Sequence, residues 1–438
     1  MFPIPVQQLD AEMDRLGLDK NITNATIRQM VSLSDALESI AGEPFVHLEL
    51  GNPGIPSSAV GVEAECEALR GGIANKYPNI AGLASLKNAG SDFLKAFLNI
   101  DINPSNIIPT VGSMQGSFTM MLLLSHRMKG RDTMLYVDPG FPAQTTQAHV
   151  LGIKRQSFDI FNYRGKKLEE KLEEIFSQGN IMGFLYSNPN NPAWTNFTEE
   201  ELEIIGRLAT KYDVIVLEDL AYMGMDFRSD FSHPNKAPYI PTVARYTDNY
   251  VLLVSGSKIF SYAGQRIAMV CISNKVAATN YPAIEEFFNM FTFVDAYVFG
   301  VLYAASSGTS HSAQYAMAAM LRAAVDGKLN FVGDCEEYRR RGEIARKLFT
   351  DNGFHLVYDQ DCGTPISDGF FFTVGYGDMD SRHIQGELMR HGICTISLPS
   401  TGSRQEGIRV CVSKLDNPAT IENLAKRLKN FSNEFPLR

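Results

Sequence analysis

The chain has 438 residues, of which 45% are hydrophobic and 20% charged, values typical of a folded globular protein. Its formal net charge is −9 at pH 7, and no cluster of Lys and Arg is evident, which argues against a protein that binds a nucleic-acid backbone. A chain of this length predicts two domains, or one large domain with a smaller partner. Because the charge argues against nucleic acid as a ligand, small molecules are the expected ligands.

The first residues, MFPIPVQQLDAEMDRLGLDK, lack the basic and then apolar layout of a signal peptide. No run of about 18 apolar residues that could span a membrane is evident in the sequence. The six cysteines stand singly, without Cys-x-x-Cys or zinc-like spacing, and are expected to be buried free thiols that bind no metal. Together these features predict a cytoplasmic protein.

From about residue 104 onward, short apolar segments alternate with helix-like segments. Strands are expected at 107–111, 132–138, 181–187 and 213–219, and helices at 116–128 and 199–212. This alternation is typical of parallel strands joined by crossover helices. We therefore expect an α/β domain whose mainly parallel sheet is covered by helices on both faces, as the fully apolar 214–217 also indicates.

After residue 270 the pattern changes to that of a smaller α+β domain. An aromatic stretch at 287–303 could line the entrance of a site or pack a dimer, and packing is the favoured interpretation. The elements expected next are a long helix near 313–347, strands at 355–359, 369–376, 394–396 and 408–413, and helices at 381–391 and from 418. We predict a large domain of residues 48–315 and a small domain of residues 1–47 and 316–438.

Ligands of open α/β sheets bind beyond the carboxyl ends of the strands, so residues directly after the apolar runs are candidates for a site. A helical pattern begins beside Ser113, where free N–H groups and the hydroxyl could hold an anion or form an ordinary helix cap. Phe141, fixed between Gly140 and Pro142, could stack on a planar ligand or pack within a turn. Neither position is decisive alone.

The next two strands end in polar groups as well. Asn191, held by Pro192, could donate to a ligand oxygen or belong to a plain loop. Strand alternation sends Glu218 and Asp219 to opposite faces, and a carboxylate at the rim of a buried sheet needs a positive partner or a hydrogen bond. Tyr222 could reach the same ligand as Asp219 if the chain turns.

The segment LLVSGSKIFSYAGQRIAMV at 252–270 carries the most informative group. Ser255, Ser257 and Arg266 offer the hydroxyl and guanidinium donors that a phosphate needs. Lys258 beside them should have a lowered pKa, because positive neighbours and partial burial disfavour its ammonium form. An isolated lysine at a strand end is usually just solvated, but this combination favours a nucleophilic amine.

Assembled, these groups describe one ligand. Its aromatic ring would lie against Phe141, its ring nitrogen would face Asp219, and its carbonyl would be available to Lys258. Pyridoxal phosphate is such a ligand, since its pyridinium nitrogen needs a carboxylate and its aldehyde forms a Schiff base with lysine.

In their order along residues 51–413, the motifs resemble those of the fold-type I pyridoxal-phosphate enzymes, in particular the class I/II aminotransferases. The set is Tyr77…Gly82, Gly112-Ser113, Phe141, Asn191-Pro192, Asp219-x-x-Tyr222, Ser255-x-Ser257-Lys258, Arg266 and Arg409. The resemblance implies an aspartate-aminotransferase-like fold and a ping-pong exchange of an amino group between an amino acid and a 2-oxo acid, as part of amino-acid metabolism and biosynthesis.

By this resemblance, Lys258 carries the cofactor and then moves the proton between the substrate α-carbon and the cofactor. Asp219 pairs with the pyridinium nitrogen, Phe141 stacks on the ring, and Asn191 and Tyr222 contact the phenolic oxygen. The implied phosphate ligands are Ser113, the backbone of Met114, Ser255 and Arg266, and Ser257 is expected to be a further cofactor-binding residue.

The resemblance also implies substrate contacts and a partner. Arg409 would clamp the α-carboxylate through two parallel hydrogen bonds, although spacing alone also allows a surface arginine on an edge strand. The backbone of Gly51 and the amide of Asn191 would contact the same substrate. Tyr77 would reach the cofactor phosphate of a neighbouring subunit, which implies a homodimer with shared sites.

Two positions depart from the family pattern. Trp194 stands where the family usually has glycine, and Met114 replaces a residue that is usually small or aromatic. The amino donor and acceptor therefore stay open. A C–S β-lyase is the alternative activity on the same cofactor, and a non-catalytic cofactor-binding module is disfavoured because both Lys258 and Asp219 are present.

Overall fold

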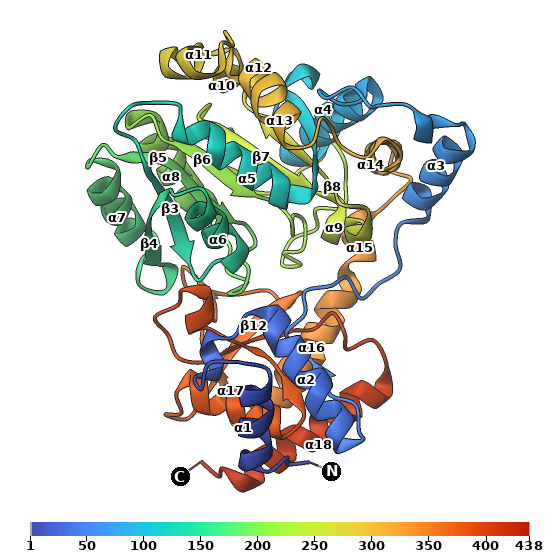
Figure 1. Cartoon of the computed structure of the whole chain (residues 1–438), viewed down its shortest axis with the longest axis vertical. Coiled ribbons are helices and arrows are strands. Elements are labelled where there is room, and N and C mark those ends of the chain that lie inside the picture. The colour runs from blue at the N-terminus through green and yellow to red at the C-terminus, as the bar shows by residue number, and fades with distance from the viewer. Residues whose placement is uncertain (1, 438) are drawn as a thin grey trace.

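A seven-stranded sheet forms the centre of the upper lobe in the computed structural model, which describes residues 2–437 (Figure 1). The strand order is β2-β8-β7-β6-β5-β3-β4, and only β8 runs antiparallel to its neighbours. The strands are β2 (Ile107–Val111), β3 (Thr133–Asp138), β4 (Lys154–Asp159), β5 (Ile181–Ser187), β6 (Ile215–Asp219), β7 (Tyr250–Ser255) and β8 (Ile267–Ile272). The predicted α/β fold with a mainly parallel sheet is confirmed.

Helices cover both faces of this sheet. Leu252 and Val254 of β7 enter one apolar core, whereas Val251 and Leu253 enter the other, so alternate side chains of one strand serve two layers. The helices of this lobe are α3 (Ala59–Arg70), α4 (Ala84–Leu98), α5 (Gly112–Ser125), α6 (Pro142–Val150), α7 (Lys166–Phe176), α8 (Glu199–Lys211), α9 (Gly256–Ile259), α10 (Asn274–Ala278) and α14 (His311–Val325). Burial on both faces explains why these strands are apolar throughout.

Strand register aligns the positions from which the site is built. Ser187 at the end of β5 pairs with Asp219 at the end of β6, and Asp219 pairs with Leu253 of β7, two residues before Ser255. The loops after these three parallel strands therefore leave the same edge of the sheet. In Figure 1 this edge faces the lower lobe.

The lower lobe contains a four-stranded antiparallel sheet of order β14-β15-β12-β9. Its elements are α16 (Glu336–Asp351), β9 (Phe354–Leu356), β12 (Phe371–Tyr376), α17 (Ser381–Arg390), β14 (Ile396–Ser397), β15 (Ile408–Cys411) and α18 (Pro418–Glu434). The N-terminal α1 (Val6–Arg15) and α2 (Ile27–Ala41) pack on this lobe, and β1 (Val46–His47) pairs with β13 (Ile393–Cys394). A short hairpin of β10 (Gln360–Asp361) and β11 (Thr364–Pro365) projects from it. The predicted domain boundaries at residues 48 and 316 stay a prediction.

Some local predictions are wrong. The long helix expected at 313–347 is instead α14 and α16 with the short α15 (Phe331–Asp334) between them, because Gly327 adopts φ +70° and ends the run. Strand β4 was not expected, since KRQSFD is a polar edge strand. Of the six free cysteines, Cys362 is exposed and Cys66 half-buried, so only four are buried thiols.

The aromatic stretch forms an irregular helical segment of α11 (Pro282–Phe288), α12 (Phe293–Asp295), a π-helix (Ala296–Leu302) and α13 (Tyr303–Ala305). By length and composition, 282–305 could cross a membrane, so the expectation that no segment qualifies is wrong. Phe293 and Tyr297 are buried in the core beside α5, but only 33% of the most apolar 18-residue stretch is buried inside the protein. Phe287 and Phe291 are exposed, and whether they pack a dimer stays a prediction.

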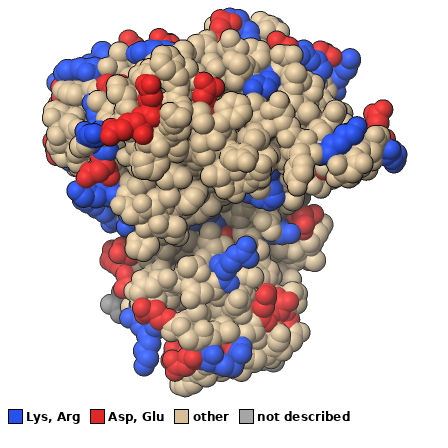
Figure 2. Space-filling view, turned by 45° about the horizontal axis from the view of Figure 1, so that its top comes forward, with Lys and Arg blue, Asp and Glu red and all other residues tan. Residues whose placement is uncertain are grey.

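A hollow separates the two lobes on the face drawn in Figure 2, and basic and acidic side chains are interspersed over that face without a large patch of one sign. This face offers no basic surface of the kind that binds a nucleic-acid backbone.

Candidate active site

Lys258 lies in α9, directly after β7, between the sheet edge and the lower lobe. Its Nζ donates a hydrogen bond to the carbonyl oxygen of Gly51 and lies 5.5 Å from the ring centre of Phe370. Burial lowers the pKa of Lys258 to about 8, and the positive charges of Arg266 and Arg409 act in the same direction. The amine can therefore be neutral near physiological pH, as a nucleophile requires.

Asp219 is the last residue of β6 and is buried. Gln144 Nε2 donates to its Oδ2 at 2.9 Å, and the backbone N–H of Ala221 donates to Oδ1 at 3.2 Å. Burial raises the pKa of Asp219 to about 6. Within residues 2–437, Asp219 forms no ion pair with a lysine or arginine, so this buried carboxylate lacks a cation.

Gln144 was not predicted from the sequence. It lies on α6, three residues after Phe141, and spacing along a helix was the one signal that could have found it. Glu218, as expected from strand alternation, points elsewhere: its carboxylate accepts from the Thr242 hydroxyl and the Val243 N–H.

Arg266 lies against the start of α5. Gly112 adopts φ +68°, and a Cβ at this position would overlap Nη2 of Arg266, so the guanidinium packs directly on the N-terminus of the helix. Both groups are positive, so an anion bound between them would be stabilised by each. The N–H of Met114 belongs to the first turn of α5, where backbone donors have no partner within the helix.

Three serines of the sequence motif carry hydroxyl groups that are candidates for phosphate binding. Ser255 Oγ accepts from the N–H of Ser257 at 3.1 Å, which leaves the Ser255 hydroxyl proton free to donate. Ser113 and Ser257 are half-buried, close to the helix starts of α5 and α9. Their roles as phosphate ligands stay a prediction.

Arg409 comes from the small sheet. Strand β15 lies between β14 and β12, and Arg409 is only 2% exposed, so the alternative of a surface arginine on an edge strand is wrong. Its Nη2 donates to the carbonyl of Glu49, and its Nη1 donates to Asn191 Oδ1 at 3.4 Å. The buried Nε has no hydrogen-bond partner in the described chain. An unsatisfied guanidinium N–H is costly, which favours a carboxylate ligand here.

The loop after β5 brings Asn191 and Trp194 to the domain boundary. The N–H of Asn191 donates to Ser187 Oγ at 3.0 Å. The Trp194 ring is fully buried, and its edge packs on Tyr222 with ring centres 5.6 Å apart. The tryptophan therefore lies behind Tyr222 and does not form an open wall of the site.

Of the remaining predicted residues, Phe141 lies near the site and Tyr77 lies at the surface. Phe141 is half-buried at the start of α6, beside a small cavity that Ser187 also lines. Tyr77 is 95% exposed, and the folded chain does not bring it into contact with the other predicted groups. Its role in a neighbouring subunit's site stays a prediction.

The sequence model of the "aminotransferase class I and II" family matches residues 44–428. The chain belongs to this family. Glutamate-pyruvate aminotransferase AlaC of Escherichia coli K12 is 26% identical over 322 residues, which cover 72% of this chain and 69% of that protein. A probable aspartate aminotransferase of Methanocaldococcus jannaschii is 24% identical over 257 residues, 59% of this chain and 63% of that relative, so the match spans about two thirds of each relative.

A solved structure shares the fold of this aminotransferase. An aspartate aminotransferase single mutant of Thermus thermophilus superposes with a TM-score of 0.76 at 18% identity, over 95% of this chain and 99% of that one. Pyridoxal phosphate is the cofactor that the family implies, and the residues present fit it. Arg266 on the helix start suits the phosphate, Asp219 lacks a cation that a pyridinium would supply, and Lys258 suits the aldehyde.

Proposed function

We propose that this aminotransferase exchanges an amino group between an amino acid and a 2-oxo acid at pyridoxal phosphate, by a ping-pong mechanism. The supporting observation is the convergence of Lys258 and Arg409 from the two lobes onto one cleft. The pKa of Lys258 is lowered to about 8, and the buried Nε of Arg409 lacks a partner within the part of the chain that the structure describes. One supplies an amine for chemistry, and the other a binding site for a carboxylate.

The cofactor would be held by residues at the carboxyl edge of the sheet. Phosphate ligands would be Ser113, the N–H of Met114, Ser255, Ser257 and Arg266. Asp219 would keep the ring nitrogen protonated, and Phe141 would cover the ring face. When bound, pyridoxal phosphate supplies an aldehyde that condenses with amines and a cationic ring that accepts the electron pair of the α-carbon.

The chain's own groups would then act in order. Arg409 binds the α-carboxylate through two parallel N–H bonds and so orients the α-carbon. Lys258 Nζ, as the neutral amine, removes the proton from the α-carbon. Gln144 holds Asp219 in place through its 2.9 Å hydrogen bond, and Asn191 and Tyr222 orient the phenolic oxygen. The second half of the cycle returns the amino group to a 2-oxo acid.

A homodimer in the cytoplasm is part of this proposal. The exposure of Tyr77 supports a contact outside its own chain, at a partner's site. The free state of all six cysteines supports a reducing compartment.

Reconstitution with pyridoxal phosphate tests the proposal. Borohydride treatment should fix the cofactor on Lys258 in the peptide map, and Lys258→Ala should abolish this while the exposed-site control Lys426→Ala does not. A screen of amino donors, each added alone, should then convert the cofactor to pyridoxamine phosphate, and a 2-oxo acid added afterwards should reverse the conversion. Absence of covalent cofactor, or release of pyruvate with ammonia in place of amino transfer, would contradict the transaminase assignment.

A further inference from the structure

Trp194 connects the upper lobe, called the large lobe below, to the lower or small lobe. It belongs to the loop after β5 of the large sheet, yet its indole Nε1 donates to Ser367 Oγ of the small lobe at 3.1 Å. The indole packs directly against Gly369. A Cβ at position 369 would overlap the ring, so any residue larger than glycine there would displace the indole. Trp194 itself holds φ +62°, a conformation that favours glycine. Tight burial of the ring therefore outweighs the backbone preference at this position.

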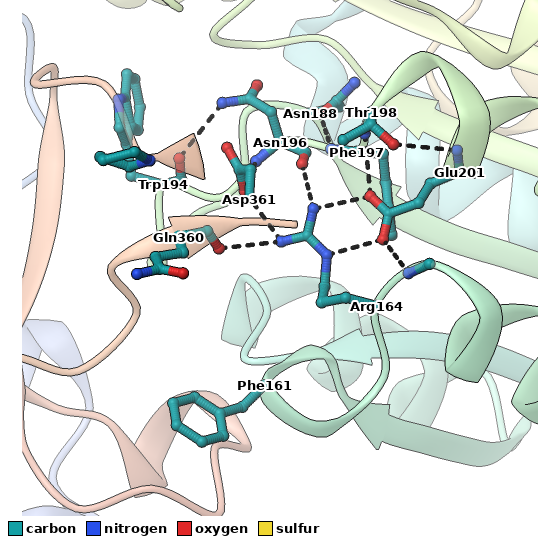
Figure 3. Close-up of polar contacts among 12 residues, drawn as sticks. Phe161, Arg164, Asn188, Trp194, Asn196, Phe197, Thr198, Glu201, Gln360 and Asp361 are labelled. Atoms are coloured by element: carbon teal, nitrogen blue, oxygen red, sulfur yellow. Dashed lines mark hydrogen bonds and ion pairs between the residues drawn. The ribbon is translucent and has the colours of Figure 1, made fainter. Parts of the chain in front are cut away.

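A buried ion cluster lies beside this contact (Figure 3). Asp361 of the β10–β11 hairpin accepts from Arg164 at 3.0 Å, from Arg228 at 2.8 Å and from the N–H of Asn196 at 2.9 Å. Arg164 also pairs with the buried Glu201, whose oxygens accept at 2.8 and 2.9 Å. The hairpin of the small lobe is thus held by Arg164 and Arg228 of the large lobe and by the N–H of Asn196, which lies two residues after Trp194.

A third contact lies nearby at the end of β4. The buried Asp159 accepts from the Tyr358 hydroxyl at 2.9 Å and from the N–H of Arg404 at 2.7 Å. The N–H of Gly140 also donates to the carbonyl of Thr401 at 2.8 Å. The chain itself crosses between the lobes on the opposite side, next to α14–α16 (Figure 1). Both sides of the cleft are therefore tied together.

The ring of Trp194 also contacts residues of the proposed active site. The Trp194 ring packs edge-on against Tyr222 of the large lobe at 5.6 Å and against Phe371 of the small lobe at 5.9 Å. The Phe371 ring in turn lies 4.8 Å from the guanidinium carbon of Arg409. One buried indole thus braces a cofactor-side residue and the support of the substrate-side arginine.

We propose that Trp194 is a positioning residue which, together with the Asp361 ion cluster, fixes the small lobe against the large one before substrate binds and so keeps Arg409 preset for the α-carboxylate. The role assigned to Arg409 rests on the proposed function. The preset arrangement itself is a property of the free chain and can be measured without cofactor.

Trp194 is the only tryptophan of the chain, so its fluorescence reports directly on the boundary between the lobes. In the apoprotein, acrylamide should quench it weakly, and addition of an amino acid with pyridoxal phosphate should leave the quenching constant unchanged. Strong quenching in the free protein that falls when ligands are added would overturn the proposal, because the lobes would then close on binding.

Single substitutions test which residues hold the two lobes together. Asp361→Asn should raise the quenching constant at least about twofold, because Arg164 and Arg228 lose their shared partner. Ser367→Ala, a milder change, should raise it in the same direction, whereas Asp359→Asn, an exposed position next to the same hairpin, should not. Equal quenching in all four proteins would overturn the role of the cluster.

The KM and kcat of Trp194 variants distinguish a positioning role of this residue from a role in folding stability alone. Trp194→Gly should raise KM for the amino donor about tenfold, a loss of about 1.4 kcal/mol of substrate binding, with kcat nearly unchanged. Trp194→Phe should restore most of the loss, because a ring still packs between Tyr222 and Phe371. An unchanged KM in Trp194→Gly would overturn the positioning role. If wild-type protein takes up no cofactor, the proposed function fails, while the quenching result still decides whether the lobes are fixed.

Discussion

The Nη1 group of Arg409 donates to Asn191 Oδ1 at 3.4 Å, which joins β15 of the small sheet to the loop after β5 of the large sheet. The contact is long, and the neighbouring Nε has no hydrogen-bond partner among residues 2–437. A substrate carboxylate could therefore complete the hydrogen bonds of the guanidinium at little cost to contacts already made.

Replacement of Arg409 by lysine tests this site. Lysine keeps the charge but loses the planar pair of N–H donors, so KM for the amino donor should rise by about ten- to a hundredfold, since hydrogen bonds to charged groups contribute about 1.5–3 kcal/mol. Steady-state kinetics with a saturating 2-oxo acid would measure the effect. The exposed-site variant Arg382→Lys should behave like wild type, and an equal effect in both would contradict the assignment.

Replacement of Asp219 by asparagine should weaken catalysis but stabilise the apoprotein. Burial raises the pKa of Asp219 from 3.8 to about 6, so the folded state binds its proton more tightly than the unfolded state. The stability linked to this group is full below about pH 4 and is lost as pH rises to about 6. At pH 7.5 the variant should gain up to about 3 kcal/mol, two pKa units at about 1.4 kcal/mol each.

Urea unfolding of both apoproteins at pH 4.5 and 7.5 would measure this difference. The gain should shrink at the lower pH, and the control variant Asp378→Asn, at an exposed position, should show no gain of this size at pH 7.5. An apoprotein destabilised by Asp219→Asn at pH 7.5 would show that the carboxylate has a compensating partner in the folded chain.

The sheet and the order of its site residues were predictable from the sequence because the central strands are buried on both faces. Their apolar runs end where polar groups are needed, as Asp219 and Ser255 illustrate. Strand β4 lies at the edge, so its outward residues Lys154 and Arg155 hide the strand pattern. Local composition could not reveal it.

Contacts between distant segments were not predictable. The burial of Trp194 depends on Gly369 and Ser367, which follow it by more than 170 positions, and its sequence neighbours give no sign of either. The same holds for the carbonyl of Glu49, which accepts from Arg409. Such contacts depend on how the two lobes meet, and no periodicity in a single segment encodes that.

The pKa of Lys258 gives a prediction about the pH dependence of its reactivity. Only the neutral amine attacks an aldehyde, so the rate of attachment of pyridoxal should rise about tenfold per pH unit and level off above about pH 8, not near the ordinary lysine value of 10.5. Pyridoxal lacks the phosphate and so reports on the amine alone. Trapping with borohydride at intervals between pH 6.5 and 10 would give the profile.

Arg266 supplies part of this shift. Arg266→Gln removes a positive charge near Lys258, so the plateau should move to higher pH. A profile that rises without a plateau up to pH 10 in wild-type protein would show that burial does not lower the pKa of Lys258.

Gly112 should be required for phosphate binding. Alanine at this position is disfavoured at φ +68°, by about 1–2 kcal/mol, and its Cβ would displace the Arg266 guanidinium from the start of α5. The Kd for pyridoxal phosphate should rise about tenfold or more, while attachment of pyridoxal should change little, because only the phosphate uses this site. Gly264→Ala is the matched control, since a Cβ there meets open space in the turn that precedes Arg266. Equal losses for both aldehydes, measured by absorbance titration, would mean that Gly112→Ala disturbs the site as a whole and would contradict a specific phosphate cradle.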